Sequence, residues 1–150
     1  MKPTPIGWPR MCASVYYEDA RAAIDWLCQA FGFEVRLKVE GEGGRIEHSE
    51  LVFGEAVVMV GQVGRGKPWK DNFVSPQQVS GNNTQSLCIF VDDADQHCER
   101  ARKAGAVIGM DPETHDYGDD YWVDRTYQAM DPEGHRWWFL QRLRDPASRG

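Results

Sequence analysis

The chain has 150 residues, 41% of them apolar and 27% charged, and a formal net charge of −6 at pH 7. This length is typical of one domain that buries a core without disulfide or metal support. The negative charge excludes the large basic surface that nucleic acid binding requires. No apolar run is long enough to span a membrane, and the first ten residues lack the apolar stretch of a signal peptide, so we expect a cytoplasmic protein.

The first half opens with a predicted strand at residues 11–17 and a helix that Asp19 caps and Gly32 ends. Apolar side chains recur at helical spacing on one face of this helix: Ala20, Ala23, Ile24, Leu27, Cys28 and Phe31. Three further strands are predicted after it: residues 33–40, 45–53 and 56–61. The first of these alternates apolar and charged side chains, which is typical of a half-buried strand.

Residues 62–84 are rich in Gly, Pro, Asn and Ser and show no periodicity, which predicts a long linker. The second half then repeats the order of the first, with a predicted helix at residues 93–104. Its four strands are predicted at residues 86–92, 106–110, 121–130 and 136–143.

The two halves also correspond in sequence. Two pairs of segments match: residues 15–32 with 89–105, and residues 48–60 with 128–140. A repeat of this length predicts two copies of one βαβββ unit that share a core. The predicted fold class is α+β, with two βαβββ modules forming a curved, cup-like, mixed or antiparallel sheet and helices on its outer face. Within one domain, 1–150, we place module one at 11–61, the linker at 62–84 and module two at 85–143.

Four segments carry a resemblance to a known family: YYEDARAAIDWLCQAFGFE, GRIEHSELVFGEAVVMVG, IFVDDADQHCERARKAGA and YGDDYWVDRTYQAMDPEGHRWWF. In order and spacing they resemble the vicinal oxygen chelate superfamily of glyoxalase I, extradiol dioxygenases and bleomycin-resistance proteins. The small bacterial glyoxalase-like and bleomycin-resistance-like members are the most similar. The resemblance covers most of residues 11–142 and implies the two-module fold.

The resemblance also implies a divalent metal held by one residue from each of four strands, typically His or Glu. Carried across by spacing, these positions hold Cys12, Val58, Ser86 and Trp138. A hard divalent ion needs carboxylate and imidazole ligands, which this set lacks. We therefore expect no metal cofactor. The four cysteines include no CxxC pair and are expected to be reduced and buried.

His48 and Glu50 stand two residues apart on a predicted strand, so both side chains point to the same sheet face. They are candidates for an acid–base pair, or for two ligands of a shifted metal site. The alternative is that they form the solvent face of an edge strand. His97 lies among charged residues of the second helix and is expected at the surface.

Aromatic side chains crowd the strands of the second module. Trp137 and Trp138 must point opposite ways, so one packs under the helix and the other lines the cup. Trp138, Trp122 and Tyr127 are candidates for stacking against a flat or cationic ligand, or for filling the core or a dimer interface.

Loop residues complete the set of ligand-binding candidates. His115 and Tyr117 belong to a loop that, in the family, borders the ligand cavity, and the alternative is a solvated loop. Trp69 in the linker is a candidate to cover a ligand or a partner subunit.

Three functions are compatible with these features. The favoured one is a small-molecule-binding protein of the bleomycin-resistance type that sequesters an aromatic or cationic ligand without metal catalysis. The second is a metal-dependent lyase, isomerase or dioxygenase using His48 and Glu50, and the third is a regulatory module that has lost the site. By resemblance we expect a homodimer, and neither nucleic acid nor membrane as a partner.

Overall fold

The computed structural model describes residues 1–64 and 72–147. The chain divides into two compact units, Met1–Asn82 and Asn83–Gly150, and each unit carries one copy of the repeat. No helix within the described residues combines the length and apolar character needed to cross a membrane.

The first unit contains a four-stranded sheet and the helix α1 (Ala20–Phe31). Its strands are β1 (Ala13–Tyr17), β2 (Glu34–Glu40), β3 (Ile46–Phe53) and β4 (Ala56–Gln62). Among its described residues, short 3-10 turns lie at η1 (Glu42–Gly44) and η3 (Pro76–Val79). The strand order is β1-β4-β3-β2, with β1 parallel to β4 and the other pairs antiparallel.

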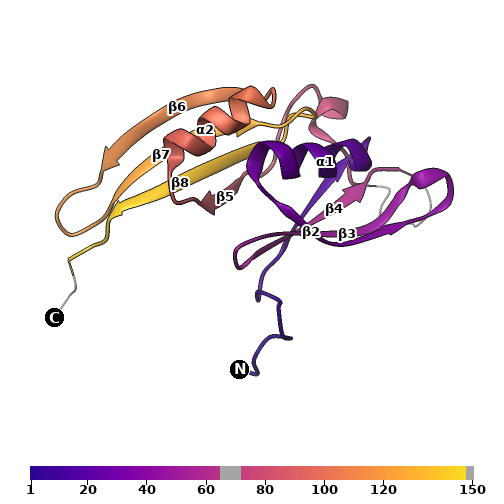
Figure 1. Cartoon of the computed structure of the whole chain (residues 1–150), viewed down its shortest axis with the longest axis horizontal. Helices are drawn as coiled ribbons and strands as arrows, with labels where there is room; N and C mark the ends of the chain where they lie inside the picture. Colours follow the sequence, from indigo (N-terminus) through magenta and orange to yellow (C-terminus); the bar gives the residue numbers. More distant parts are fainter. Residues whose placement is uncertain (65–71, 148–150) are drawn as a thin grey trace. The chain divides into compact units, whose positions relative to one another are not determined.

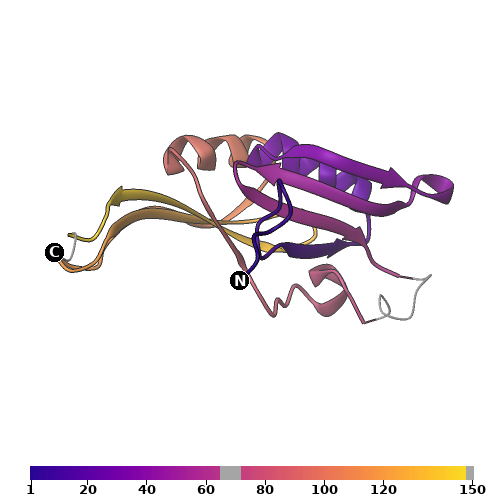
Figure 2. The same ribbon diagram turned by 90° about the horizontal axis from the view of Figure 1, so that it is seen from below.

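The second unit repeats this arrangement with the helix α2 (Ala94–Lys103). Its strands are β5 (Leu87–Phe90), β6 (Val107–Asp116), β7 (Val123–Met130) and β8 (Arg136–Arg144). The order β5-β8-β7-β6 is that of the first sheet, and β5 is parallel to β8. Figures 1 and 2 show one helix against one face of each sheet. The prediction of two βαβββ modules in an α+β fold is confirmed, and each sheet is mixed.

Both helices begin and end as the sequence predicts. The Asp19 side chain accepts a hydrogen bond from the Ala22 backbone at the start of α1, and Gly32 takes a left-handed conformation with φ 82° at its end. This conformation favours glycine because glycine has no Cβ. Asp93 caps α2 in the same way, accepting from the backbone of Gln96.

The core of each unit lies between the helix and one sheet face. In the first unit α1 buries Ile24, Leu27 and Phe31, and β3 contributes the fully buried Leu51. In the second unit Trp137, Phe139 and Tyr127 are fully buried beneath α2. Because strand side chains alternate, residues next to these point to the opposite face of their sheet, which we call the open face.

The prediction that residues 33–40 form a half-buried strand is wrong in its burial. The strand forms, but every residue of β2 is exposed, including Val35, Leu37 and Val39. The reason is its position at the edge of the sheet, where it has one neighbouring strand instead of two. The alternation of apolar and charged residues therefore predicts the strand but not its position at the edge of the sheet.

Candidate functional site

The open face of the second sheet carries rows of side chains in register across three strands. Cys88 of β5 is the Cα partner of Trp138 on β8, and Trp138 in turn is the partner of Gln128 on β7. The next pair on the same face is Leu140 of β8 with Thr126 of β7. Trp138 therefore stands near the middle of the face that α2 does not cover.

A cavity of about 390 Å³ lies on this open face. We call it the second-sheet cavity, and eight residues line it: Ser86, Cys88, Met110, His115, Tyr117, Thr126, Trp138 and Leu140. Its volume falls within the range of about 300–1,000 Å³ that is usual for small-molecule pockets. Apolar side chains combined with a few hydroxyl and imidazole groups give it the character of such a pocket.

The structure brings three of the predicted ligand-binding residues, Trp138, His115 and Tyr117, to this cavity. The prediction that His115 lies in a loop is wrong, because β6 continues to Asp116 and pairs His115 with Asp124 of β7. Trp122 lies beside it, because its ring packs against that of Tyr117 with centroids 5.7 Å apart. His115 and Tyr117 are also neighbours, with ring centroids 6.3 Å apart. The rings of His115, Tyr117 and Trp122, which we call the aromatic rim, therefore border the part of the cavity that Trp138 lines.

The expectation that Tyr127 belongs to this surface is wrong. Tyr127 points to the α2 side of β7, is fully buried, and stacks on Phe139 with centroids 5.0 Å apart. Its hydroxyl lies 2.5 Å from His97 Nδ1, and burial raises the pKa of the Tyr127 hydroxyl well above its usual range. The prediction that His97 lies at the surface is also wrong, because the His97 ring packs on Phe139. Trp69 lies outside the described residues.

Two further expectations concern the neighbours of Trp138. Trp137 and Trp138 do point opposite ways, since Trp137 is fully buried while Trp138 lines the second-sheet cavity. Cys88 also lines the cavity and is exposed, so the expectation that all four cysteines are buried is wrong. Cys88 alternates with the core residue Ile89 on a strand with one covered face.

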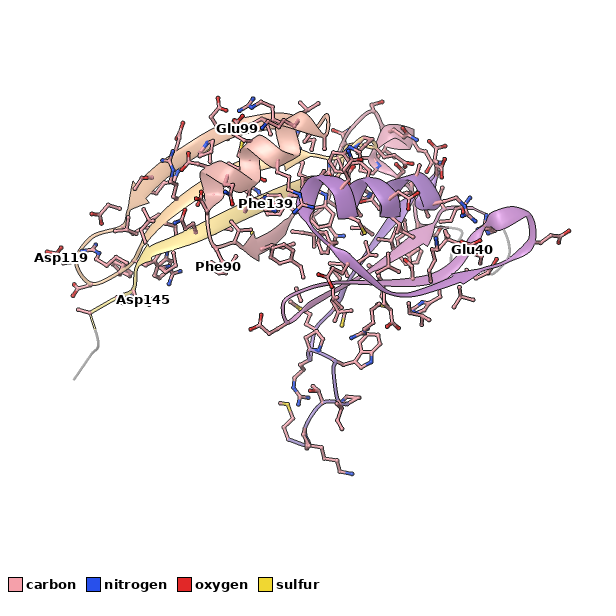
Figure 3. All side chains as sticks on the ribbon, in the orientation of Figure 1. Glu40, Phe90, Glu99, Asp119, Phe139 and Asp145 are labelled. Atoms are coloured by element: carbon pink, nitrogen blue, oxygen red, sulfur yellow. The ribbon has the colours of Figure 1, made fainter. Side chains whose placement is uncertain are left out.

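An ion pair that the sequence did not indicate continues the open face beyond the cavity. Asp124 and Arg142 are Cα partners, one position beyond Thr126 and Leu140 on the same face. Arg142 Nε donates to Asp124 Oδ1 at 2.5 Å, and only 4% of the Asp124 side chain is exposed. The guanidinium carbon of Arg142 also lies 5.3 Å from the ring centres of both Phe90 and Trp122. Phe90 is the Cα partner of Leu140 and therefore shares the open face, whereas Phe139 is a core residue; Figure 3 labels both.

On the first sheet, His48 and Glu50 form a hydrogen-bonded pair. His48 Nε2 lies 2.9 Å from Glu50 Oε1, and Arg36 Nε donates to Glu50 Oε2 at 2.8 Å. The hydrogen bond from His48 lowers the pKa of the Glu50 carboxyl, burial partly opposes this change, and Arg36 lowers the pKa further. The alternative of an edge strand is wrong, because β3 lies between β4 and β2.

The segment before β1 contacts Arg36, the cation that pairs with Glu50. Arg36 Nη1 donates to the backbone carbonyl of Gly7 at 2.5 Å, and the Arg36 guanidinium lies 4.4 Å from the ring centre of Trp8. Glu50 is only 7% exposed, whereas 42% of the His48 side chain is exposed. The exposed imidazole is therefore the one member of the pair that solvent reaches readily.

The strand pairing corrects one of the four positions implied by the family resemblance. Ala13 pairs with Val58 and Ser14 with Met59, just as Leu87 pairs with Trp137 and Cys88 with Trp138. The counterpart of Trp138 in the first sheet is therefore Met59. Val58, which is 5% exposed and faces the α1 core, corresponds to Trp137.

Comparison with protein families matches residues 11–139 to the family described as the Glyoxalase/Bleomycin resistance protein/Dioxygenase superfamily. Among curated proteins, uncharacterized protein Mb0911c of Mycobacterium bovis is 29% identical over 141 residues, which cover 91% of this chain and 86% of that protein. Uncharacterized protein Rv0887c of Mycobacterium tuberculosis is also 29% identical, over 91% of this chain and 76% of its own length.

Two solved structures illustrate the likeness in fold. TioX from Micromonospora sp. ML1 has a TM-score of 0.67 and 29% identity, covering 89% of this chain and 95% of TioX. TnmS3 from Streptomyces sp. CB03234, described as an antibiotic binding protein, has a TM-score of 0.64 and 18% identity, covering 95% of this chain and 98% of TnmS3. At 18% identity the likeness to TnmS3 is one of fold alone.

Proposed function

The chain belongs to the Glyoxalase/Bleomycin resistance protein/Dioxygenase superfamily, and within it we propose that this protein binds an aromatic or cationic small molecule without metal catalysis. The observation that carries the proposal is the place of Trp138. Its indole lines the second-sheet cavity at the position where the family resemblance implies a metal ligand. An indole there offers a flat surface for stacking and no atom that binds a hard cation.

The aromatic rim supports the same function. Tyr117 is half-exposed, and Trp122 packs beside it at the edge of the cavity. Offset or edge-to-face contacts between a ligand ring and such side chains contribute about 0.5–1.5 kcal/mol each beyond the buried area. TnmS3, which is described as antibiotic binding, shares the fold, so a protein with this architecture is known to hold a small molecule.

The residues at the implied metal positions do not fit a divalent ion. Corrected by the strand pairing, these positions hold Cys12, Met59, Ser86 and Trp138. A thiol, a thioether, a hydroxyl and an indole do not supply the carboxylate and imidazole ligands that hard divalent ions need, and one thiol alone does not complete a tetrahedral site for a softer ion such as Zn²⁺. Within residues 1–64 and 72–147, no group of three or more His, Cys, Asp or Glu side chains is placed to hold a metal.

A second candidate function is a superfamily lyase, isomerase or dioxygenase that uses His48 and Glu50. The observation in its favour is the 2.9 Å hydrogen bond, because a carboxylate that orients a partly exposed imidazole is a common arrangement for a general base. Arg36 weakens the case for a metal at Glu50, since its guanidinium already occupies the second carboxylate oxygen.

Two measurements on purified protein test the proposal. We expect tryptophan fluorescence to report saturable binding of aromatic compounds from a panel of neutral, cationic and anionic ring systems, and Trp138→Ala to weaken it at least about tenfold. We expect elemental analysis after dialysis against Zn, Ni, Mn and Fe to find less than one metal per chain. Stoichiometric metal that is lost in His48→Ala and Glu50→Gln would favour the enzyme instead.

A further inference from the structure

The second-sheet cavity carries no fixed charge of its own. None of its eight lining residues is Asp, Glu, Lys or Arg, although the whole chain carries a net charge of −6. Its polar groups are hydroxyls such as those of Ser86 and Thr126, together with the imidazole of His115. The negative charge of the protein is therefore not presented by the surface that a ligand would contact.

The one carboxylate in the adjoining row of the open face is neutralised. Asp124 is 3% exposed and lies one pair beyond Thr126 and Leu140, so its charge would otherwise act on any ligand in the cavity. Arg142 Nε donates to it at 2.5 Å. In return, hydrogen bonds from the guanidinium to Asp124 and Asp145 raise the pKa of Arg142 and keep it charged.

Arg142 is fixed in this position by more than its ion pair. Phe90 and Trp122 each place a ring 5.3 Å from its guanidinium carbon. Arg142 Nη1 also donates to Asp145 at 2.9 Å, although that carboxylate is largely exposed and contributes little. The cation that compensates Asp124 is therefore contacted by two aromatic rings and two carboxylates.

Two acidic residues at the rim, Asp116 and Asp119, are paired with the guanidinium of Arg144. Arg144 Nη2 lies 2.9 Å from Asp116 Oδ1, and Arg144 Nη1 lies 3.6 Å from Asp119 Oδ1. Glu113, the Cα partner of Thr126, places its Oε2 3.9 Å from His115 Nε2, and this imidazole is a cation only when it is protonated. These carboxylates are well exposed, so water and salt screen the charge that remains.

We propose that the Asp124–Arg142 pair cancels the charge of the buried Asp124 carboxylate beside the second-sheet cavity and so restricts that cavity to uncharged, planar aromatic ligands. This inference rests on the proposed function and narrows its ligand class from aromatic or cationic to neutral aromatic. A cation entering the cavity loses its hydration and meets no carboxylate in the lining and no unpaired buried carboxylate beside it, which is unfavourable. A neutral ring loses little hydration, stacks on Trp138, and reaches the hydroxyls of Ser86 and Thr126 with any hydroxyl or carbonyl that it carries.

A matched pair of probes tests the inference on the unmodified protein. The probes are 9-anthracenemethanol and 9-(aminomethyl)anthracene, which share one ring system and differ at pH 7 in the charge of one substituent. We expect the alcohol to bind at least about tenfold more tightly than the ammonium compound in tryptophan-quenching titrations. Equal or tighter binding of the ammonium compound overturns the inference and leaves the proposed function intact. If neither these probes nor 9-anthracenecarboxylate bind, the proposed function itself fails.

Removing the compensating cation gives a second test. Arg142→Gln leaves the Asp124 carboxylate unpaired beside the cavity, so we expect the ratio of alcohol to ammonium affinity to fall at least about fivefold. The control is Arg125→Gln, because Arg125 of β7 also pairs with a carboxylate, donating from Nε and Nη2 to Asp95, but does so on the α2 side of the sheet. It removes the same charge from the chain, and we expect it to leave the ratio within about twofold.

The double variant Asp124→Asn with Arg142→Gln covers the case in which Arg142→Gln alone does not fold. It removes both charges and leaves no buried carboxylate unpaired, and we expect it to keep the wild-type preference for the alcohol. A double variant that prefers the ammonium compound contradicts the inference, because its selectivity would then have another source. An unchanged ratio in a folded Arg142→Gln protein contradicts it as well.

Discussion

Trp137 and Trp138 are consecutive in β8 and serve the two faces of the second sheet. Trp137 is fully buried under α2, and its Nε1 donates to Asp131 Oδ2 at 3.0 Å. Trp138 lines the second-sheet cavity on the open face. Because neighbouring strand residues point to opposite sides, one dipeptide supplies both a core residue and a ligand-facing residue.

This division predicts opposite phenotypes for the two alanine variants. Trp137→Ala removes a buried indole and should lower the free energy of unfolding by about 3–5 kcal/mol. Trp138→Ala should change that free energy by about 1 kcal/mol or less and weaken binding of a neutral aromatic probe at least about tenfold. Urea unfolding and fluorescence titration measure the two effects. Equal loss of stability in both variants would contradict the division.

Asp131 is predicted to stabilise the turn that precedes β8. Its Oδ1 accepts hydrogen bonds from the backbone amides of Glu133 and His135, and its Oδ2 accepts one from Trp137. Asp131→Ala should lower the free energy of unfolding by at least about 2 kcal/mol, since it leaves buried donors unpaired. Asp119→Ala, at a fully exposed carboxylate, is the control and should change it by less than about 0.5 kcal/mol.

The two tyrosines of the predicted ligand surface should behave differently. Tyr117→Ala removes part of the cavity lining and should weaken binding of the aromatic probe severalfold without loss of stability. Tyr127→Phe removes the hydroxyl that meets His97 and should cost about 1 kcal/mol in urea unfolding while leaving binding unchanged. A loss of binding in Tyr127→Phe, measured on folded protein, would show that this hydroxyl acts at the cavity after all.

The fold followed from the sequence because its signals are local and occur twice. Asp19 and Gly32 mark the ends of α1 through hydrogen bonds within one turn, and the same arrangement recurs at Asp93. Strand alternation was less informative at β2, because a strand's position at the sheet edge depends on partners far along the chain. Val35, Leu37 and Val39 alternate with charged residues as a half-buried strand would, and all three are exposed.

The site was only partly predictable, because register is a property of paired strands. Spacing alone placed Val58 opposite Trp138, and the ladders place Met59 there, one residue away. The Asp124–Arg142 pair joins residues 18 positions apart and leaves no sequence motif. His97 was misassigned because its charged neighbours on α2 suggested solvent, whereas its own side chain reaches Tyr127 beneath the helix.

Glu50 is predicted to make the stability of the protein depend on pH. The hydrogen bond from His48 and the ion pair with Arg36 favour the ionised carboxyl, so its folded-state pKa lies below the ordinary value of 4.5. A group with a depressed folded pKa binds its proton more readily in the unfolded chain. Its stabilising contribution is therefore complete above about pH 4.5 and is lost as the pH falls through the folded pKa.

The measurement is the difference in unfolding free energy between wild type and Glu50→Gln, followed by urea titration from pH 7 to pH 2.5 (about two units below the unfolded pKa). We expect wild type to be the more stable at pH 7, and the difference to shrink as the carboxyl protonates. Glu47→Gln, at an exposed neighbour on the same strand, should give a small difference across this range. A difference for Glu50→Gln that stays constant down to pH 2.5 would mean that the lost stability comes from packing and not from the charge of Glu50.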